Sequence, residues 1–191
     1  MRPLTWLIGL RGSREQTEDR PVKSLYLLRH AKSSWDDPSL SDIDRPLNQR
    51  GERDAPRMGT ALGTRLVPMT FHVSPAVRAQ RTFRLVQKNW KGLKKRHGVT
   101  APALYTFDYR EVLAWISTQP PAVERLAVVG HNPALTEVVN YLVGPGTLEN
   151  LPTAGWVELA LGVEDWSAIH SAQSQGQLVY RLFPKELSGV A

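Results

Sequence analysis

Two histidines and two arginines stand near the expected ends of buried strands, and these residue types could together transfer a phosphoryl group. Arg29 and His30 directly follow an apolar run. His131 follows a second such run after one glycine, and Arg78 lies shortly behind a third. A neutral imidazole is a nucleophile toward phosphorus, and the planar guanidinium fork matches phosphate oxygens. Nearby guanidinium groups also lower the pKa of an imidazole, which keeps its lone pair available near neutral pH.

The segments that must position these side chains alternate between strand-like and helix-like patterns. This alternation predicts an α/β fold, a three-layer α/β/α sandwich with a mainly parallel sheet. Strands are expected over residues 22–28, 69–73, 104–107, 125–129, 156–163 and 177–183, the last two of them antiparallel. Because the carboxyl ends of parallel strands meet at one edge of a sheet, the two histidines and two arginines are expected to converge there.

Helix-start signals follow several of the expected strands. Asn48 can cap a helix with an apolar face, which Pro56 is expected to kink or to divide in two. Ser74-Pro75 and Asn132-Pro133 each combine a capping residue with a proline at the first helical position, and a short helix is expected over 110–116. Helix amino termini carry unpaired N–H groups and a positive dipole end. Gathered at one sheet edge, they favour a tetrahedral dianion as the ligand.

The amino-acid composition limits the classes of protein and of functional site that are possible. The chain has 191 residues, 41% of them hydrophobic, and a net charge of +6, which predicts one substantial core and anionic partners. It contains no cysteine, which excludes disulfides, a thiolate nucleophile and cysteine-ligated metals. The remaining histidines show no metal-ligand spacing with carboxylates, and no glycine-rich nucleotide loop is present, so neither a metal nor another cofactor is expected.

Residues 1–20 are interpreted as a flexible extension, and residues 21–191 as a single domain. The apolar run near the amino terminus is too short for a secretory signal peptide or a membrane span. A cytoplasmic protein without a membrane partner is therefore expected. The basic cluster at residues 91–97 is interpreted as a solvated helix end before Gly98, and no nucleic-acid partner is expected. The oligomeric state is not indicated.

Four separated segments resemble the histidine phosphatase superfamily. They are Leu-Tyr-Leu-Leu-Arg-His-Ala-Lys-Ser-Ser-Trp at 25–35, Asp-Arg-Pro-Leu-Asn-Gln-Arg-Gly at 44–51, Ser-Pro-Ala-Val-Arg-Ala at 74–79 and Val-Val-Gly-His-Asn-Pro at 128–133. Within the superfamily, the first two segments are most similar to SixA-type phosphohistidine phosphatases. The resemblance extends from about residue 23 to residue 187. It implies a phosphoglycerate mutase-like fold and a two-step reaction through a covalent phosphohistidine.

The resemblance also implies roles for individual residues. His30 would be the nucleophile, in a phosphate pocket lined by Arg29, Arg78 and His131, with His131 as a hydrogen-bond donor to the phosphoryl group. Arg45 would bind substrate at the pocket mouth, although a salt bridge within the loop explains it equally well. The rim of the pocket would include three further polar residues, Ser33, Ser34 and Asp36.

At the position of the proton donor, this sequence differs from the wider superfamily. Related phosphomonoesterases usually carry an acidic residue after a Leu-Tyr pair, where this chain has Thr106. Asp108 and Glu111 are the nearest substitutes, and each is also explained as a helix cap or a solvated charge. An alkoxide leaving group needs a proton donor, whereas the imidazole of a phosphoramidate leaves once solvent has protonated it. A weak or absent acid therefore favours a substrate with an N–P bond.

The favoured hypothesis is a metal-independent phosphatase that acts on phosphohistidine in a protein or on a small phosphorylated compound. One alternative is a phosphomonoesterase or phosphoglycerate mutase-like enzyme with Asp108 or Glu111 as its acid. A second alternative is an inactive module that binds phosphoproteins through the arginine pocket without turnover.

Overall fold

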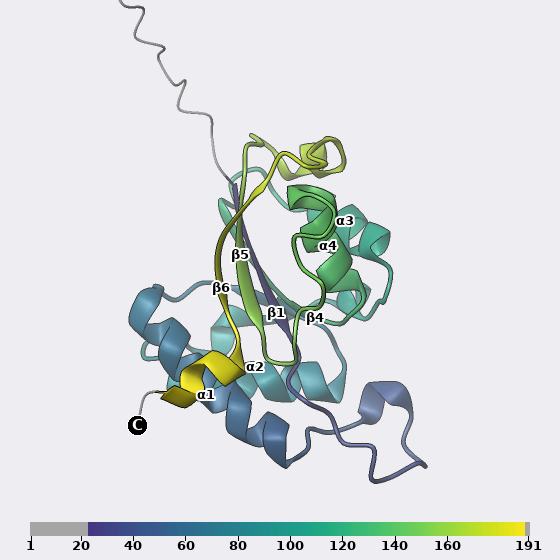
Figure 1. The fold of residues 1–191 in the computed structure, drawn as a ribbon, viewed down its shortest axis with the longest axis vertical. Coiled ribbons are helices and arrows are strands. Elements are labelled where there is room, and N and C mark those ends of the chain that lie inside the picture. Colours follow the sequence, from purple (N-terminus) through teal and green to yellow (C-terminus); the bar gives the residue numbers. More distant parts are fainter. Residues whose placement is uncertain (1–22, 190–191) are drawn as a thin grey trace, which may run out of the picture.

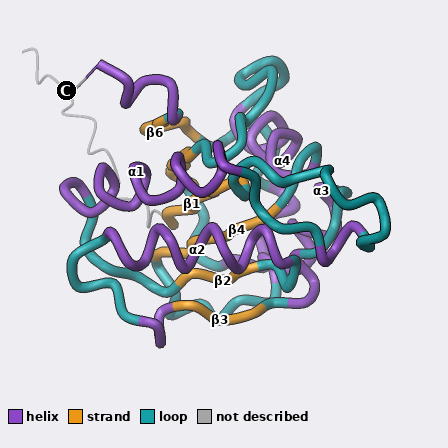
Figure 2. The backbone as a smooth tube through the Cα atoms, turned by 90° about the horizontal axis from the view of Figure 1, so that it is seen from below, coloured by secondary structure: helices purple, strands orange, loops and turns teal. Residues whose placement is uncertain are grey.

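Six strands form one mixed sheet in the computed structural model, which describes residues 23–189. Their order is β3 (Gly98–Thr100), β2 (Phe71–Val73), β4 (Arg125–Gly130), β1 (Lys23–Arg29), β5 (Trp156–Leu161) and β6 (Gln177–Leu182), with β3 and β6 at opposite edges (Figure 2). Neighbours from β3 to β1 pair in parallel, whereas β5 and β6 are antiparallel to their neighbours. The mainly parallel sheet and the antiparallel final pair are confirmed.

Helices cover both faces of this sheet because side chains along each strand alternate between two cores. In β1, Leu25 and Leu27 pack in the core that includes α3 (Tyr109–Ser117) and α4 (Ala134–Val143). Tyr26 and Leu28 pack in the other core, with α1 (Gln49–Arg65) and α2 (Val77–Asn89). Figure 1 shows α3 and α4 together on one side of the strands. The three-layer α/β/α architecture is confirmed.

The chain also contains five 3₁₀ helices within the described residues. They are η1 (Asp42–Asp44), η2 (Lys95–His97), η3 (Pro102–Leu104), η4 (Trp166–Ser171) and η5 (Pro184–Gly189). Over residues 23–189, no helix combines the length and the apolar character needed to cross a membrane. The expected extension at residues 1–20 lies outside the described residues.

Two helix starts and one strand differ from the prediction. Helix α2 begins at Val77 and α4 at Ala134, because the Ser74 and Asn132 side chains form tertiary hydrogen bonds instead of capping. Residues 104–107 form the end of η3 and a loop rather than a strand. The sheet edge is formed instead by β3, whose first residue, Gly98, had been interpreted as a helix terminator.

Helix α1 keeps its predicted cap but not its predicted division. The Asn48 side chain accepts a hydrogen bond from the Gly51 backbone N–H at 3.0 Å. The helix is continuous through Pro56, so the expected division into two pieces is wrong. Its buried face, which includes Met58 and Leu62, packs against the sheet and α2, and this packing stabilises the helix despite the missing backbone donor.

Gly59 lets α1 approach α2 closely. A Cβ atom added to Gly59 would lie 2.4 Å from the Val86 carbonyl oxygen, which is backbone and must move to make room. We expect Gly59→Ala to lower the free energy of unfolding by about 1–3 kcal/mol, measured by urea denaturation. Gly162→Ala is the control, because no atom lies within 4 Å of its added Cβ. Equal stability of the two variants would contradict this account of the helix contact.

Candidate active site

The register of the sheet brings three chain segments together beyond the ends of β1, β2 and β4. Arg29 pairs with Gly130. The next residues, His30 and His131, therefore lie beside each other, with ring centroids 5.0 Å apart. Ser74 follows β2 and places its hydroxyl oxygen 2.7 Å from Nε2 of His131. The predicted convergence of side chains at this edge is seen for the two histidines.

His30 is held in one tautomer by the backbone of the next residue, Ala31. Its Nδ1 lies 2.7 Å from the carbonyl oxygen of Ala31, which can only accept, so Nδ1 carries the proton and donates. The Ala31 N–H in turn donates to Oγ1 of Thr82 on α2, at 2.9 Å. The lone pair is therefore on Nε2, which accepts a hydrogen bond from Nε of Arg78 at 3.3 Å. Nε2 is the nucleophilic atom that this geometry provides.

The imidazoles of both histidines are kept neutral. Burial lowers the pKa of His30 to about 3, and electrostatic repulsion by His131, if it were protonated, and by the charged Arg78 and Arg29 lowers it further, whereas the hydrogen bond to Ala31 opposes the shift. Burial also lowers the pKa of His131 to about 3, assisted by Arg78 and Arg29 and opposed by Asp42. The His30 imidazole therefore keeps its lone pair over the whole neutral and mildly acidic range.

The lowered pKa of His30 predicts how its imidazole titrates with pH. The unfolded imidazole binds a proton near pH 6.5, whereas the folded one does so only near pH 3, so acidification between these values favours the unfolded state. We expect the His30 ring signals in an NMR titration to stay constant from pH 8 to about pH 5, while the free energy of unfolding falls below pH 6.5. A His30 midpoint near 6.5 would contradict the account.

His131 is oriented by the opposite arrangement of its ring nitrogens. Its Nδ1 lies 3.3 Å from Nη2 of Arg78, which can only donate, so Nδ1 accepts. Its Nε2 then carries the proton and donates to the Ser74 hydroxyl. The rings of Tyr105 and Phe107 pack around it, with centroids at 5.5 and 5.6 Å. The N–H of His131 faces Ser74 in this state.

Arg78 connects the two histidines. It comes from the first turn of α2, and its side chain is only 3% exposed. Its guanidinium group contacts both imidazoles and also forms a 2.8 Å ion pair with Asp42 on η1. A buried planar cation touching the nucleophile can neutralise the oxygens of a phosphoryl group in transfer.

Arg29 is the last residue of β1 and directly precedes His30. Its Nη1 donates to the carbonyl oxygen of Leu151 at 2.8 Å and weakly to Oδ1 of Asn150 at 3.4 Å. Its Nε is buried and has no hydrogen-bond partner among the described residues. Burial lowers the pKa of this guanidinium group. An unpaired buried donor on the residue next to His30 is suited to an anionic ligand.

Arg45 is buried, and its guanidinium group forms hydrogen bonds with other residues of the protein. It donates to the Ser33 hydroxyl at 2.8 Å, to the Ser34 carbonyl at 3.0 Å and to Oδ1 of Asp42 at 3.1 Å. Its Cζ lies 3.1 Å from the ring centroid of the exposed Trp35. Arg45 thus organises the rim of the pocket and reaches Arg78 only through Asp42. Asp36, also predicted for the rim, accepts a hydrogen bond from the Ser34 hydroxyl at 2.6 Å.

The two candidate proton donors lie on the surface. Asp108 caps α3 by accepting from the Arg110 backbone N–H at 2.8 Å, and Glu111 is exposed in the first turn. Within the described part of the chain, neither carboxylate is hydrogen-bonded to His30 or His131. Thr106 is buried, and its hydroxyl accepts from the Asp108 backbone N–H at 3.1 Å.

Sequence reasoning missed Asp42 and Tyr105. Asp42 forms an ion pair with Arg78, and Tyr105 forms a hydrogen bond with Asp42. The hydroxyl of Tyr105 donates to Oδ2 of Asp42 at 2.8 Å. One signal was present, since Asp42 precedes Arg45 by three residues, a spacing that allows an ion pair within one helical turn. No comparable local signal marked Tyr105.

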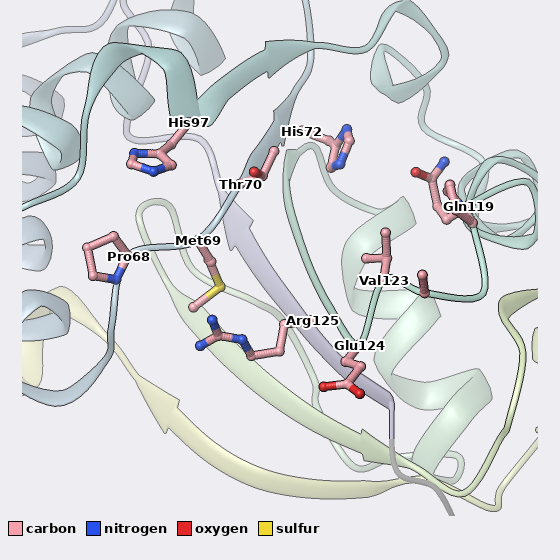
Figure 3. A pocket seen from close by; sticks show the side chains of 11 residues that line it. Pro68, Met69, Thr70, His72, His97, Gln119, Val123, Glu124 and Arg125 are labelled. Atoms are coloured by element: carbon pink, nitrogen blue, oxygen red, sulfur yellow. The ribbon is translucent and has the colours of Figure 1, made fainter.

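A separate cavity of about 670 Å³ lies at the amino ends of β2 and β4, at the opposite end of these strands from His30 (Figure 3). His72, His97, Glu124 and Arg125 are among its lining residues. His72 packs against the Trp115 ring, with centroids 5.0 Å apart. Across residues 23–189, no three histidine, aspartate or glutamate side chains gather as metal ligands. Arg29, His30, Arg78 and His131 are not among the residues that line this cavity.

Comparison with known proteins gives consistent matches. The model of the histidine phosphatase superfamily (branch 1) matches residues 25–101, which include both His30 and Arg78. An uncharacterized chloroplastic protein from Arabidopsis thaliana is 31% identical over 132 residues, which is 64% of this chain. The chain spans 60% of the length of that relative.

Solved structures share the fold. SixA from Agrobacterium tumefaciens, assigned as a phosphohistidine phosphatase, is 26% identical with a TM-score of 0.69, over 85% of this chain and 98% of its own. Phosphoglycerate mutase from Bacillus anthracis str. Sterne is 18% identical with a TM-score of 0.56, over 81% of this chain and 98% of its own. The fold is therefore phosphoglycerate mutase-like, as predicted.

Proposed function

Because the chain belongs to the histidine phosphatase superfamily and is of the SixA type, we propose that it is a phosphatase whose nucleophile is His30. The observation that carries the proposal is the fixed tautomer of His30, whose Nε2 lone pair faces the buried Arg78. Arg29 and His131 complete the phosphate pocket. The sequence match to the superfamily covers both His30 and Arg78.

The reaction has two steps. In the first, Nε2 of His30 attacks phosphorus, an N–P bond forms, and the bond to the leaving group breaks with its electron pair on that group. Arg29 and Arg78 neutralise the phosphoryl oxygens, which carry the charge in the transition state. In the second step, water attacks phosphorus, the N–P bond breaks, and inorganic phosphate leaves neutral His30 behind. The two guanidinium groups supply the neutralising charge, so we propose a metal-independent reaction.

The favoured substrate is phosphohistidine in a protein, or a small compound with an N–P bond. Thr106 stands at the position where related phosphomonoesterases carry an acidic proton donor, and the nearby Asp108 carboxylate caps a helix. The imidazole of phosphohistidine leaves readily once it is protonated by solvent, whereas an alkoxide requires a positioned acid. The assignment of the structurally similar Agrobacterium SixA as a phosphohistidine phosphatase supports the same choice.

A comparison of two substrates tests this choice. We expect kcat/KM to be higher for a phosphohistidine peptide than for an alkyl phosphate ester, with little change in Asp108→Asn or Glu111→Gln. Faster turnover of the ester, lost in Asp108→Asn or Glu111→Gln, would instead support a phosphomonoesterase or mutase-like enzyme. Binding of the phosphopeptide without any turnover would support an inactive binding module.

A further inference from the structure

The anion site formed by Arg78 is already in contact with an anion of the protein itself. Oδ2 of Asp42 lies 2.8 Å from Nη2 of Arg78, and the Asp42 backbone carbonyl accepts from Nη1 of the same guanidinium group. Tyr105 donates to Oδ2, and Arg45 donates to Oδ1 at 3.1 Å. The carboxylate of Asp42 is therefore held by two arginines and a tyrosine at the pocket.

These contacts use every nitrogen of the Arg78 guanidinium group. Its Nε donates to His30, Nη2 contacts His131 and the Asp42 carboxylate, and Nη1 donates to the Asp42 carbonyl. A phosphoryl group on Nε2 of His30 would need donors from the same group. Phosphate and Asp42 thus compete for one cation.

Asp42 is the partner that can move in this pair. Its side chain is 44% exposed on the short helix η1, whereas that of Arg78 is 3% exposed on α2. Arg45 is buried, and its bonds to Ser33 and Ser34 do not depend on Asp42. A displaced Asp42 carboxylate therefore keeps one cationic partner, which limits the cost of its release from Arg78.

We propose that the Asp42 carboxylate is an internal competitor of the substrate phosphate for Arg78. Displacing Asp42 imposes the same cost on every phosphate ligand, so Asp42 lowers the affinity of the site for phosphate in general. The return of Asp42 to Arg78 also promotes release of inorganic phosphate. This inference rests on the proposed function and concerns the regulation of the same site.

Calorimetric titration with inorganic phosphate and with tungstate tests the competition. Asp42→Asn keeps the side-chain size and removes the charge, so we expect both anions to bind about tenfold more tightly. Tyr105→Phe removes one hydrogen bond to Asp42 and should give a smaller gain. Asp44→Asn is the matched control, because Asp44 lies on the same helix, is exposed and forms no ion pair among the described residues. Circular dichroism checks that each variant folds.

A second experiment measures kcat/KM for a phosphohistidine protein and for phosphoramidate. Because displacing Asp42 costs the same for both substrates, we expect Asp42→Asn to raise kcat/KM for both by a similar factor. Unchanged or weaker anion binding in Asp42→Asn, or an equal gain in Asp44→Asn, would overturn the competition. An unchanged or lower kcat/KM for both substrates would overturn its role during turnover. Tighter anion binding in Asp42→Asn without a phosphoenzyme on His30 would instead retain the competition and refute the proposed function.

Discussion

Replacing His30 with alanine is expected to lower kcat by at least about 10⁴-fold, because it removes the imidazole that we propose forms the covalent intermediate. The surrounding residues would still bind phosphate, so the affinity for tungstate should fall much less than the rate. The measurement is steady-state hydrolysis of a phosphohistidine peptide. His170→Ala is the control, since His170 is an exposed histidine on η4, away from the pocket.

Folding must be checked in the same experiment. His30 is buried and its ring is hydrogen-bonded to Ala31, so the variant leaves a small cavity. Unchanged circular dichroism and a cooperative unfolding transition would assign the loss of rate to chemistry. Residual turnover above one tenth of the wild-type rate would contradict the assignment of His30 as the nucleophile.

Arg78→Ala is expected to lower kcat/KM by about 10²- to 10³-fold, because it removes a cation that contacts the nucleophile and neutralises the transferred phosphoryl group. Arg78→Lys should recover little of this loss. A lysine ammonium is a point charge and cannot reach His30, His131 and the phosphate together, as a planar fork can. Arg84→Ala provides the control, since Arg84 lies on the same helix and is exposed.

The two Arg78 variants also separate charge from geometry. Arg78→Lys preserves the net charge of the chain, so a rate close to that of the wild type would show that charge alone suffices. That result would contradict the role given to the guanidinium fork. Binding of tungstate, measured beside the rates, shows how much of the loss arises from weaker anion binding.

Five of the six strands, all except β3, and the gathering of His30 and His131 could be predicted from the sequence, because both depend on local patterns. The apolar run of β1 ends at Arg29, and that of β4 ends at Gly130, so the positions of His30 and His131 follow from the parallel pairing. The cap at Asn48 was also predictable, since its partner lies three residues away.

Other features depend on contacts between distant segments. Ser74 has the local signature of a helix cap, but its hydroxyl instead binds His131, which lies 57 residues later. Asp42 is one of four aspartates between residues 36 and 44, and only the fold determines which of them meets Arg78. β3 is three residues long, too short to show a period, and it forms only because it pairs with β2.

The central claim is that His30 carries the phosphoryl group during turnover. The most direct measurement is to mix the protein with a phosphohistidine substrate, quench it in alkali within the first turnover, and map the phosphorylated residue by tandem mass spectrometry. The account predicts a single acid-labile phosphoryl group on His30, attached at Nε2, that decays as inorganic phosphate appears. A phosphoryl group on another residue, or turnover with no phosphoenzyme, would contradict it.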